Sequence, residues 1–118
     1  MNRLFLTSFA AFFALTTAAL ADFQKVESQS DFVSAVNGKT LTRPLVKLTV
    51  SPNGGISGTG AVWDVSGSWT WQDGYFCRSL EWGGDDLGYN CQQVEVRGSK
   101  IRFTSDRGGG QSADFTLR

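Results

Sequence analysis

Apolar and polar residues alternate along most of the chain from residue 46 onwards, a pattern that predicts β-strands with one buried face. Turn-forming residues, such as the Ser-Pro-Asn-Gly-Gly run at 51–55, separate these stretches. Strands at spacings of roughly 8–12 residues are typical of an all-β sandwich or barrel. About seven short strands are therefore expected, within residues 46–50, 56–62, 65–71, 75–80, 91–96, 100–104 and 113–117.

Glycines and tryptophans in the expected strands indicate where the chain bends and which side chains are buried. The strand at 56–62 contains Gly58 and Gly60, which weaken a strand unless a bulky side chain packs over them or the strand bends. Trp69 and Trp71 lie on one face of the next strand, and we expect both in the core. The Asp-Gly pair at 73–74 then predicts a tight hairpin.

One short helix is expected before the strands. Ser30 can cap it, Phe32, Ala35 and Val36 repeat at helical spacing, and Gly38 can end it. A meander of hairpins that closes on itself has no free edge and leaves a mouth for a ligand, and the helix can close one end. The expected fold is all-β, a small antiparallel barrel or strongly twisted meander, with a two-sheet sandwich as the alternative.

Residues 1–21 have the pattern of a secretory signal peptide. Arg3 precedes a largely apolar run from Leu4 to Leu20, and Ala19-Leu20-Ala21 forms an A-x-A cleavage site. An uncleaved membrane anchor is the alternative, but the run is short for a bilayer span and contains Thr and Ser. We therefore expect a periplasmic or secreted protein that does not span a membrane after cleavage, with residues 22–118 as a single β domain.

Charge and composition exclude several classes of function. The chain has 11 basic residues, 11 acidic residues and no histidine, so Ser-His-Asp and Cys-His catalysis and histidine-dependent zinc sites are excluded. Binding to nucleic acid needs an excess of positive charge on one face, and no nucleic-acid partner is expected. The one local excess of basic residues is expected to be solvated and comprises Arg97, Lys100, Arg102 and Arg107.

The two cysteines of the chain, Cys77 and Cys91, lie 14 positions apart on either side of a glycine-rich connection at 82–88. Adjacent antiparallel strands would present two such residues to each other. Exported proteins enter an oxidising compartment, where nearby thiols form disulfides. A redox-active pair is the alternative, but the chain has no C-x-x-C motif. We therefore expect a structural disulfide between Cys77 and Cys91.

Carboxylates are the remaining candidates for catalysis or metal binding. Asp85 and Asp86 are adjacent in the glycine-rich connection, but the D-x-D-x-D-G register of a calcium loop is absent. A glycosidase needs two carboxyl groups opposed across a cleft, and Asp64, Asp73 and Glu81 are the acids near aromatic residues. Sequence spacing does not establish a cleft, so no catalytic residue, metal ligand or cofactor is predicted.

Trp63 and Trp82 stand apart from the other tryptophans because they lie at strand ends, where an indole is often half exposed. Together with Arg78, they are predicted to line a site for a small ring, a sugar or a side chain of a partner protein.

The run W-D-V-S-G-S-W-T-W-Q-D-G-Y-F-C-R, residues 63–78, resembles a group of small exported proteins of alphaproteobacteria. The likeness continues through residues 89–92 and 102–108 and so covers most of the chain after residue 21. Members of this group often carry the label dihydrodipicolinate reductase, which implies a reductase that uses a nicotinamide cofactor. Such a reductase needs G-x-G-x-x-G between a strand and a helix, and a substrate domain. This chain has neither the motif in that context nor the length.

The sequence thus favours a non-enzymatic periplasmic binding or accessory module that engages a small ligand or an envelope protein. Two alternatives remain open: the reductase named by the label, and a structural or inhibitory envelope protein with a flat surface. A concave pocket lined by Trp63, Trp82 or Arg78 would favour the binding module, and a filled barrel would favour the structural protein.

Overall fold

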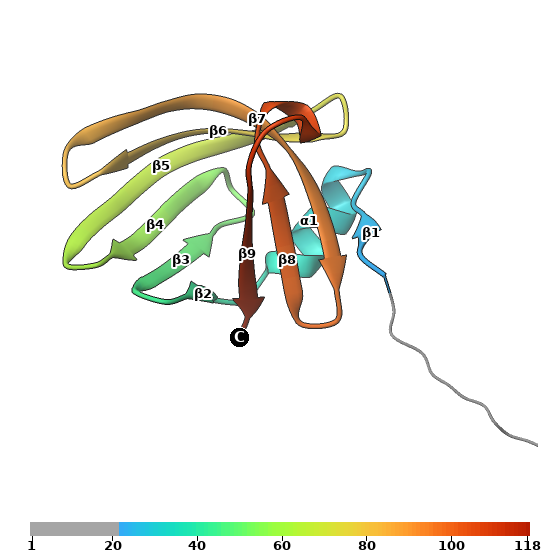
Figure 1. Ribbon diagram of the computed structural model, residues 1–118, viewed down its shortest axis with the longest axis horizontal. Helices are drawn as coiled ribbons and strands as arrows, with labels where there is room; N and C mark the ends of the chain where they lie inside the picture. Colours follow the sequence, from blue (N-terminus) through green and yellow to red (C-terminus); the bar gives the residue numbers. More distant parts are fainter. Residues whose placement is uncertain (1–21) are drawn as a thin grey trace, which may run out of the picture.

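The computed structural model describes residues 22–118, so the predicted signal peptide at 1–21 lies outside the described residues. Residues 22–118 form a closed antiparallel barrel of eight strands, with a ninth short strand and one α-helix packed against it (Figure 1). The prediction of an all-β barrel with a short helix is therefore confirmed. No helix within this range is long and apolar enough to cross a membrane.

A single long strand, β7, closes the barrel. Along its first part it pairs with β6, and along its second part with β8, so that the ring of strands follows the order β7-β6-β5-β4-β3-β2-β9-β8. The short strand β1 pairs with β7 beside this ring. The elements are β1 (Gln24–Lys25), α1 (Gln29–Val36), β2 (Leu41–Arg43), β3 (Val46–Val50), β4 (Gly55–Gly60), β5 (Trp63–Gln72), β6 (Tyr75–Trp82), β7 (Asp85–Arg97), β8 (Lys100–Thr104), η3 (Asp106–Gly108) and β9 (Ser112–Leu117).

The strands differ from the predicted ones in three places. β1 and β2 have two and three residues, too few to produce a visible alternation. The alternation places Val62 in a strand, but Val62 lies in the turn between β4 and β5 and is 84% exposed. The expected connection at 82–88 is a hairpin in which Trp82 pairs with Asp85 across two glycines with φ of 58° and 90°. Glycine adopts such angles without strain, so both strands continue to the turn.

The N-cap of α1 is Ser28, and the prediction of Ser30 is wrong. Ser28 has an extended backbone (φ −126°, ψ 154°), and its hydroxyl accepts a hydrogen bond from the backbone N–H of Asp31 at 3.2 Å. Ser30 lies within the first turn of the helix. A Ser followed three residues later by an acidic residue resembles a capping box, and this spacing identifies Ser28. Phe32 and Val36 form the buried face of the helix, as predicted.

Phe32 fixes the helix to the barrel. Its side chain is fully buried, and its ring lies 4.9 to 6.4 Å, centroid to centroid, from four aromatic rings on β5, β6 and β8. These rings belong to Trp69, Trp71, Phe76 and Phe103. Because three strands contribute them, Phe32 fills one end of the barrel interior. Burial of such a ring stabilises the fold by roughly 1.5–3 kcal/mol.

Trp69 and Trp71 both point into this core, as predicted. Trp69 is 4% exposed, and its indole N–H donates to the carbonyl of Ser51 at 2.9 Å, so its buried polar atom is paired. Trp71 is partly buried and stacks on Phe32 with an interplanar angle of 26°.

Glycines in β4 and β5 lie where other groups approach closely. A Cβ atom on Gly67 would collide with the backbone of Ser79 and the side chain of Leu80. Gly60 lies beneath the indole of Trp82, whose Nε1–H donates to the Gly60 carbonyl at 2.9 Å. The expectation that bulky side chains compensate for strand glycines is therefore met at Gly60.

Cys77 and Cys91 form the predicted disulfide. The two residues are directly opposed in the register of β6 and β7. Cys77 alternates with the inward-facing Phe76 and Arg78, which places the disulfide on the outer side of the barrel wall. The bond joins β6, the strand that carries Arg78, to its hairpin partner β7.

Substitution of Trp69 by alanine should lower the free energy of unfolding by about 3–5 kcal/mol, because it leaves a cavity and removes the hydrogen bond from the indole to the Ser51 carbonyl. Trp63→Ala is a matched control, since it removes the same indole from a position that is 54% exposed. Trp63→Ala should lower stability by less than about 1 kcal/mol. Urea denaturation of the two variants measures the difference, and equal losses would contradict the assignment of Trp69 to the core.

The double substitution Cys77→Ala with Cys91→Ala should lower the free energy of unfolding by about 3 kcal/mol, since the open loop regains entropy in the unfolded chain. A reducing agent should lower the stability of the wild type by a similar amount and leave the double variant unchanged. Chemical denaturation with and without the reductant measures both. A reductant-sensitive double variant would show that the loss has another cause.

Candidate ligand-binding cavity

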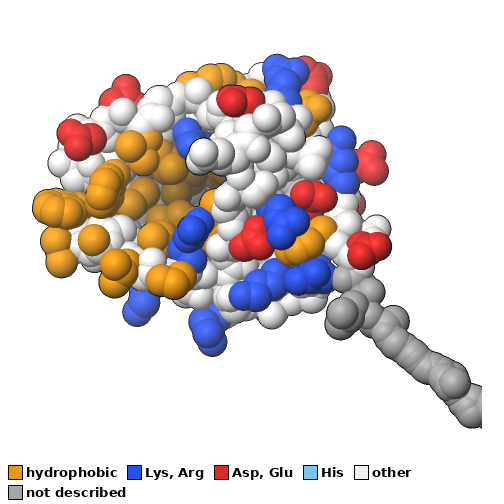
Figure 2. Space-filling view, viewed as in Figure 1, with side chains coloured by type: hydrophobic (Ala, Val, Ile, Leu, Met, Phe, Trp, Pro, Cys, Tyr) orange, Lys and Arg blue, Asp and Glu red, His pale blue; other side chains and the backbone are white. Residues whose placement is uncertain are grey.

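The barrel interior is filled at the helix end and hollow at the other. The hollow is a cavity of about 390 Å³ that opens to solvent, and Figure 2 shows it as a depression with largely hydrophobic walls. Phe76 and Phe103 contact Phe32 on one side and line the cavity on the other, so they form its floor. A cavity of this size is at the lower end of the range for small-molecule sites.

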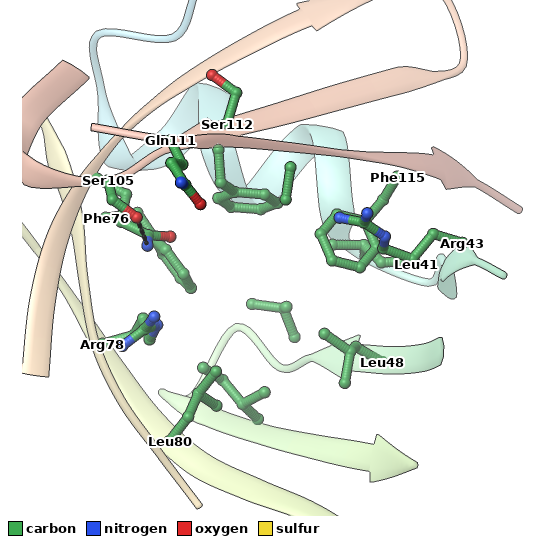
Figure 3. Close-up of a pocket in the computed structure, with 15 residues that line it drawn as sticks. Leu41, Arg43, Leu48, Phe76, Arg78, Leu80, Ser105, Gln111, Ser112 and Phe115 are labelled. Carbon is green, nitrogen blue, oxygen red and sulfur yellow. Dashed lines mark hydrogen bonds between the residues drawn. The ribbon is translucent and has the colours of Figure 1, made fainter. Parts of the chain in front are cut away.

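The cavity lining is mainly apolar, with polar groups from two regions. Figure 3 shows Leu48 and Leu80 on one wall and Ser105, Gln111 and Ser112 on another. Arg78 and Arg43 lie on opposite sides of the empty centre (Figure 3). The complete lining consists of Leu41, Arg43, Leu48, Val50, Ile56, Phe76, Arg78, Leu80, Gln92, Phe103, Ser105, Gln111, Ser112, Ala113 and Phe115.

Arg78 enters the cavity from the middle of β6. The strand alternates Phe76, Arg78 and Leu80 on its inner face, so a cation occupies a position between two apolar residues. Its Nη1 donates to the carbonyl of Gly88 at 3.0 Å. Gly88 follows a β-bulge in which Leu87 has no partner on β6, and its φ of 82° is in the left-handed region that favours glycine. The bulge therefore supplies the acceptor that orients Arg78.

The electrostatic environment of Arg78 is unusual for an arginine. Partial burial lowers the pKa of Arg78 from its usual value, while the guanidinium stays protonated at neutral pH. None of the lining residues is acidic. Within residues 22–118 the one ion pair joins Arg102 to Asp114, outside the cavity. Arg78 is therefore a half-buried cation without a carboxylate partner in the part of the chain that the structure describes.

The remaining polar lining residues are held by hydrogen bonds or lie at the mouth. Gln92 is 8% exposed, and its Nε2 donates to Ser105 Oγ at 3.1 Å. Arg43 is exposed, and its guanidinium carbon lies 5.6 Å from the centroid of the Phe115 ring. A second cation thus stands at the rim across from Arg78.

The structure separates the three residues that the sequence groups into one site. Arg78 lines the cavity, whereas neither Trp63 nor Trp82 belongs to its lining. The two tryptophans pack edge to face, with centroids 5.7 Å apart, where β4, β5 and β6 end at their turns. Trp82 covers Gly60 there, and Trp63 remains more than half exposed.

Sequence reasoning missed most of the cavity lining. The inward alternation of Phe76, Arg78 and Leu80 is visible in the sequence and points to a cation inside the barrel. Arg43 gives no such signal, because β2 has only three residues. Gln111 and Ser112 lie beyond η3, which occupies part of the connection between the strands expected at 100–104 and 113–117.

The carboxylates that the sequence offers lie away from the cavity. Asp64 and Glu81 are exposed on the outer side of β5 and β6, and Asp73 forms the hairpin turn with a φ of 54°. Asp86 accepts a hydrogen bond from the backbone N–H of Gly88 at 2.7 Å and so supports the bulge. No group of three potential metal-ligating side chains occurs within residues 22–118.

No known protein family model matches the chain, and neither a curated protein nor a solved structure is significantly similar to it. The cavity is therefore the feature of the molecule that bears on its function.

Proposed function

We propose that this protein is a non-enzymatic binding module of the bacterial envelope that takes a small, mainly apolar ligand into the open end of its barrel. The observation that carries the proposal is the cavity of about 390 Å³, which has an aromatic floor and opens to solvent. A barrel with no binding role would gain stability by filling this space with side chains.

The chemistry of the lining supports binding rather than catalysis. The chain lacks histidine, and the acids near its aromatic residues lie outside the cavity. The lining offers arginine, hydroxyl and amide groups that can orient a ligand, and these groups have little capacity for proton transfer near neutral pH.

An extracytoplasmic location fits the same proposal. The Cys77–Cys91 disulfide is compatible with an oxidising compartment. The predicted signal peptide adds the expectation of export, and the periplasm is the compartment that we propose.

A role in binding an envelope protein is the second candidate, favoured by exposed apolar side chains at adjacent turns. Leu45, Val62 and Trp63 are 79%, 84% and 54% exposed. The turns of Leu45 and Val62 are neighbours, since the N–H of Ala61 donates to the Leu45 carbonyl at 2.7 Å. Apolar side chains gathered on a surface often mark a contact. A photoreactive amino acid at position 62 should then cross-link to one discrete protein in intact cells.

A neutral apolar fluorophore, N-phenyl-1-naphthylamine, should bind the purified protein and be displaced by decanol. Ala113→Trp places an indole at the cavity wall and should weaken this binding roughly tenfold or more, which corresponds to about 1.4 kcal/mol. Fluorescence titration measures the affinities. Ser57→Trp is the control, because it adds the same ring on the outer side of β4.

Equal weakening by both tryptophan variants would place the fluorophore outside the cavity. Failure of the wild type to bind the fluorophore, decanol and amphipathic ligands with the same aliphatic chain would contradict the proposed function itself.

NADPH should show no saturable binding to the protein. A dinucleotide fold places the pyrophosphate on backbone N–H groups at a helix N-terminus that follows a parallel strand. Here the sheet is antiparallel. The Ser28 hydroxyl already accepts a hydrogen bond from the backbone N–H of Asp31 at the start of α1. Isothermal titration calorimetry tests this expectation. Micromolar binding of NADPH would favour the reductase alternative and count against the binding module.

A further inference from the structure

We propose that the ligand of the cavity is an aliphatic monocarboxylate, with its carboxylate on the guanidinium of Arg78 and its chain against the apolar walls. This inference rests on the proposed function and specifies the chemical class of the ligand.

The first support is the set of donors that Arg78 leaves available. A guanidinium carries five N–H donors in a planar fork. One protein acceptor, the Gly88 carbonyl, is paired with Arg78 within residues 22–118. This bond fixes one side of the group, and Figure 3 shows the guanidinium directed into the cavity. The remaining N–H groups are therefore presented to an incoming ligand.

The second support is the charge of the cavity. Arg78 and Arg43 are its charged lining residues, and no carboxylate of the lining balances them. Burial of a cation without a partner is unfavourable, and a bound anion relieves this penalty while a neutral or cationic ligand does not. Partial burial also lowers the pKa of Arg78, as expected for a cation that is removed from water and has no nearby carboxylate.

The third support is the separation of polar and apolar walls. Gln111 and Ser105 lie on the same side of the cavity as Arg78, whereas Leu48 lies on the opposite side (Figure 3). A molecule with a polar group at one end and an aliphatic chain at the other matches this division. A compact polar ion would leave the leucine walls unfilled, and a hydrocarbon would leave the guanidinium unpaired.

A singly charged carboxylate fits the placement of the two cations better than a doubly charged phosphate. A planar guanidinium pairs with either group through two parallel hydrogen bonds, so the distinction depends on the second cation. Arg43, the second cation, lies on the opposite side of the cavity in Figure 3 and is exposed at the rim. The cavity thus offers one inner cation, which suits a monoanion, rather than two converging cations for a dianion.

Decanoate, decanol and decylamine share one chain and differ in the charge of the end group, so they test the inference directly. Each would be titrated by calorimetry below its aggregation concentration, at neutral pH, against the wild type, Arg78→Gln and Lys47→Gln. Lys47 lies exposed on the outer side of β3, and its substitution matches the change in net charge. Monodecyl phosphate is the fourth ligand and separates the two anionic head groups.

The wild type should bind decanoate at least tenfold more tightly than decanol, and decylamine most weakly. Arg78→Gln should weaken decanoate by about tenfold to a hundredfold, the loss expected for hydrogen bonds between charged groups. Decanol binding by the same variant should change less than threefold, which also shows that the cavity is intact. Lys47→Gln should behave as the wild type.

Three results would overturn the inference while the proposed function stands: equal binding of decanoate and decanol, equal weakening of decanoate by Arg78→Gln and Lys47→Gln, or tighter binding of monodecyl phosphate than of decanoate. If none of the four ligands and no apolar fluorophore binds, the proposed function fails as well.

Discussion

Insertion of Phe32 into one end of the barrel is the contact on which the rest of the architecture depends. A short helix has little stability of its own, and α1 gains it by placing a fully buried ring among aromatic side chains of β5, β6 and β8. The same ring completes the core at that end. Phe76 and Phe103 then pack against Phe32 on one side and line the cavity on the other, so the helix determines how deep the open end can be.

The longest hairpin of the barrel carries the inner cation of the candidate site. Its strands, β6 and β7, are joined on the outer side by the Cys77–Cys91 disulfide and carry Arg78 on the inner side. A bulge at Gly88 turns a backbone carbonyl toward the guanidinium. A constraint on the outside of the wall and a hydrogen bond on the inside therefore act on the same few residues, which favours a preorganised arginine.

The sequence predicts the parts of this fold that depend on local pattern. Alternation identifies β3, β5, β8 and β9, the Asp-Gly pair identifies the hairpin at Gly74, and elimination identifies the disulfide. The same reasoning fails where pattern is short or ambiguous, as in the three-residue β2 and at the N-cap, where two serines compete. Barrel closure is also beyond local pattern, because it depends on β7 pairing with different partners along its length.

The residues of the candidate site are harder to predict from the sequence than the strands. Tryptophan concentration suggests Trp63 and Trp82 as ligand contacts, yet the structure places Trp82 over Gly60, where it fills space that a glycine leaves. A large ring near a strand glycine is thus as consistent with packing as with binding. Arg78 carries the opposite signal, since a cation among inward-facing apolar residues lowers the stability of the unliganded barrel. Under the proposed binding of a carboxylate, the bound anion supplies the compensating charge, so a cost in stability that the aromatic residues do not carry distinguishes Arg78 from them.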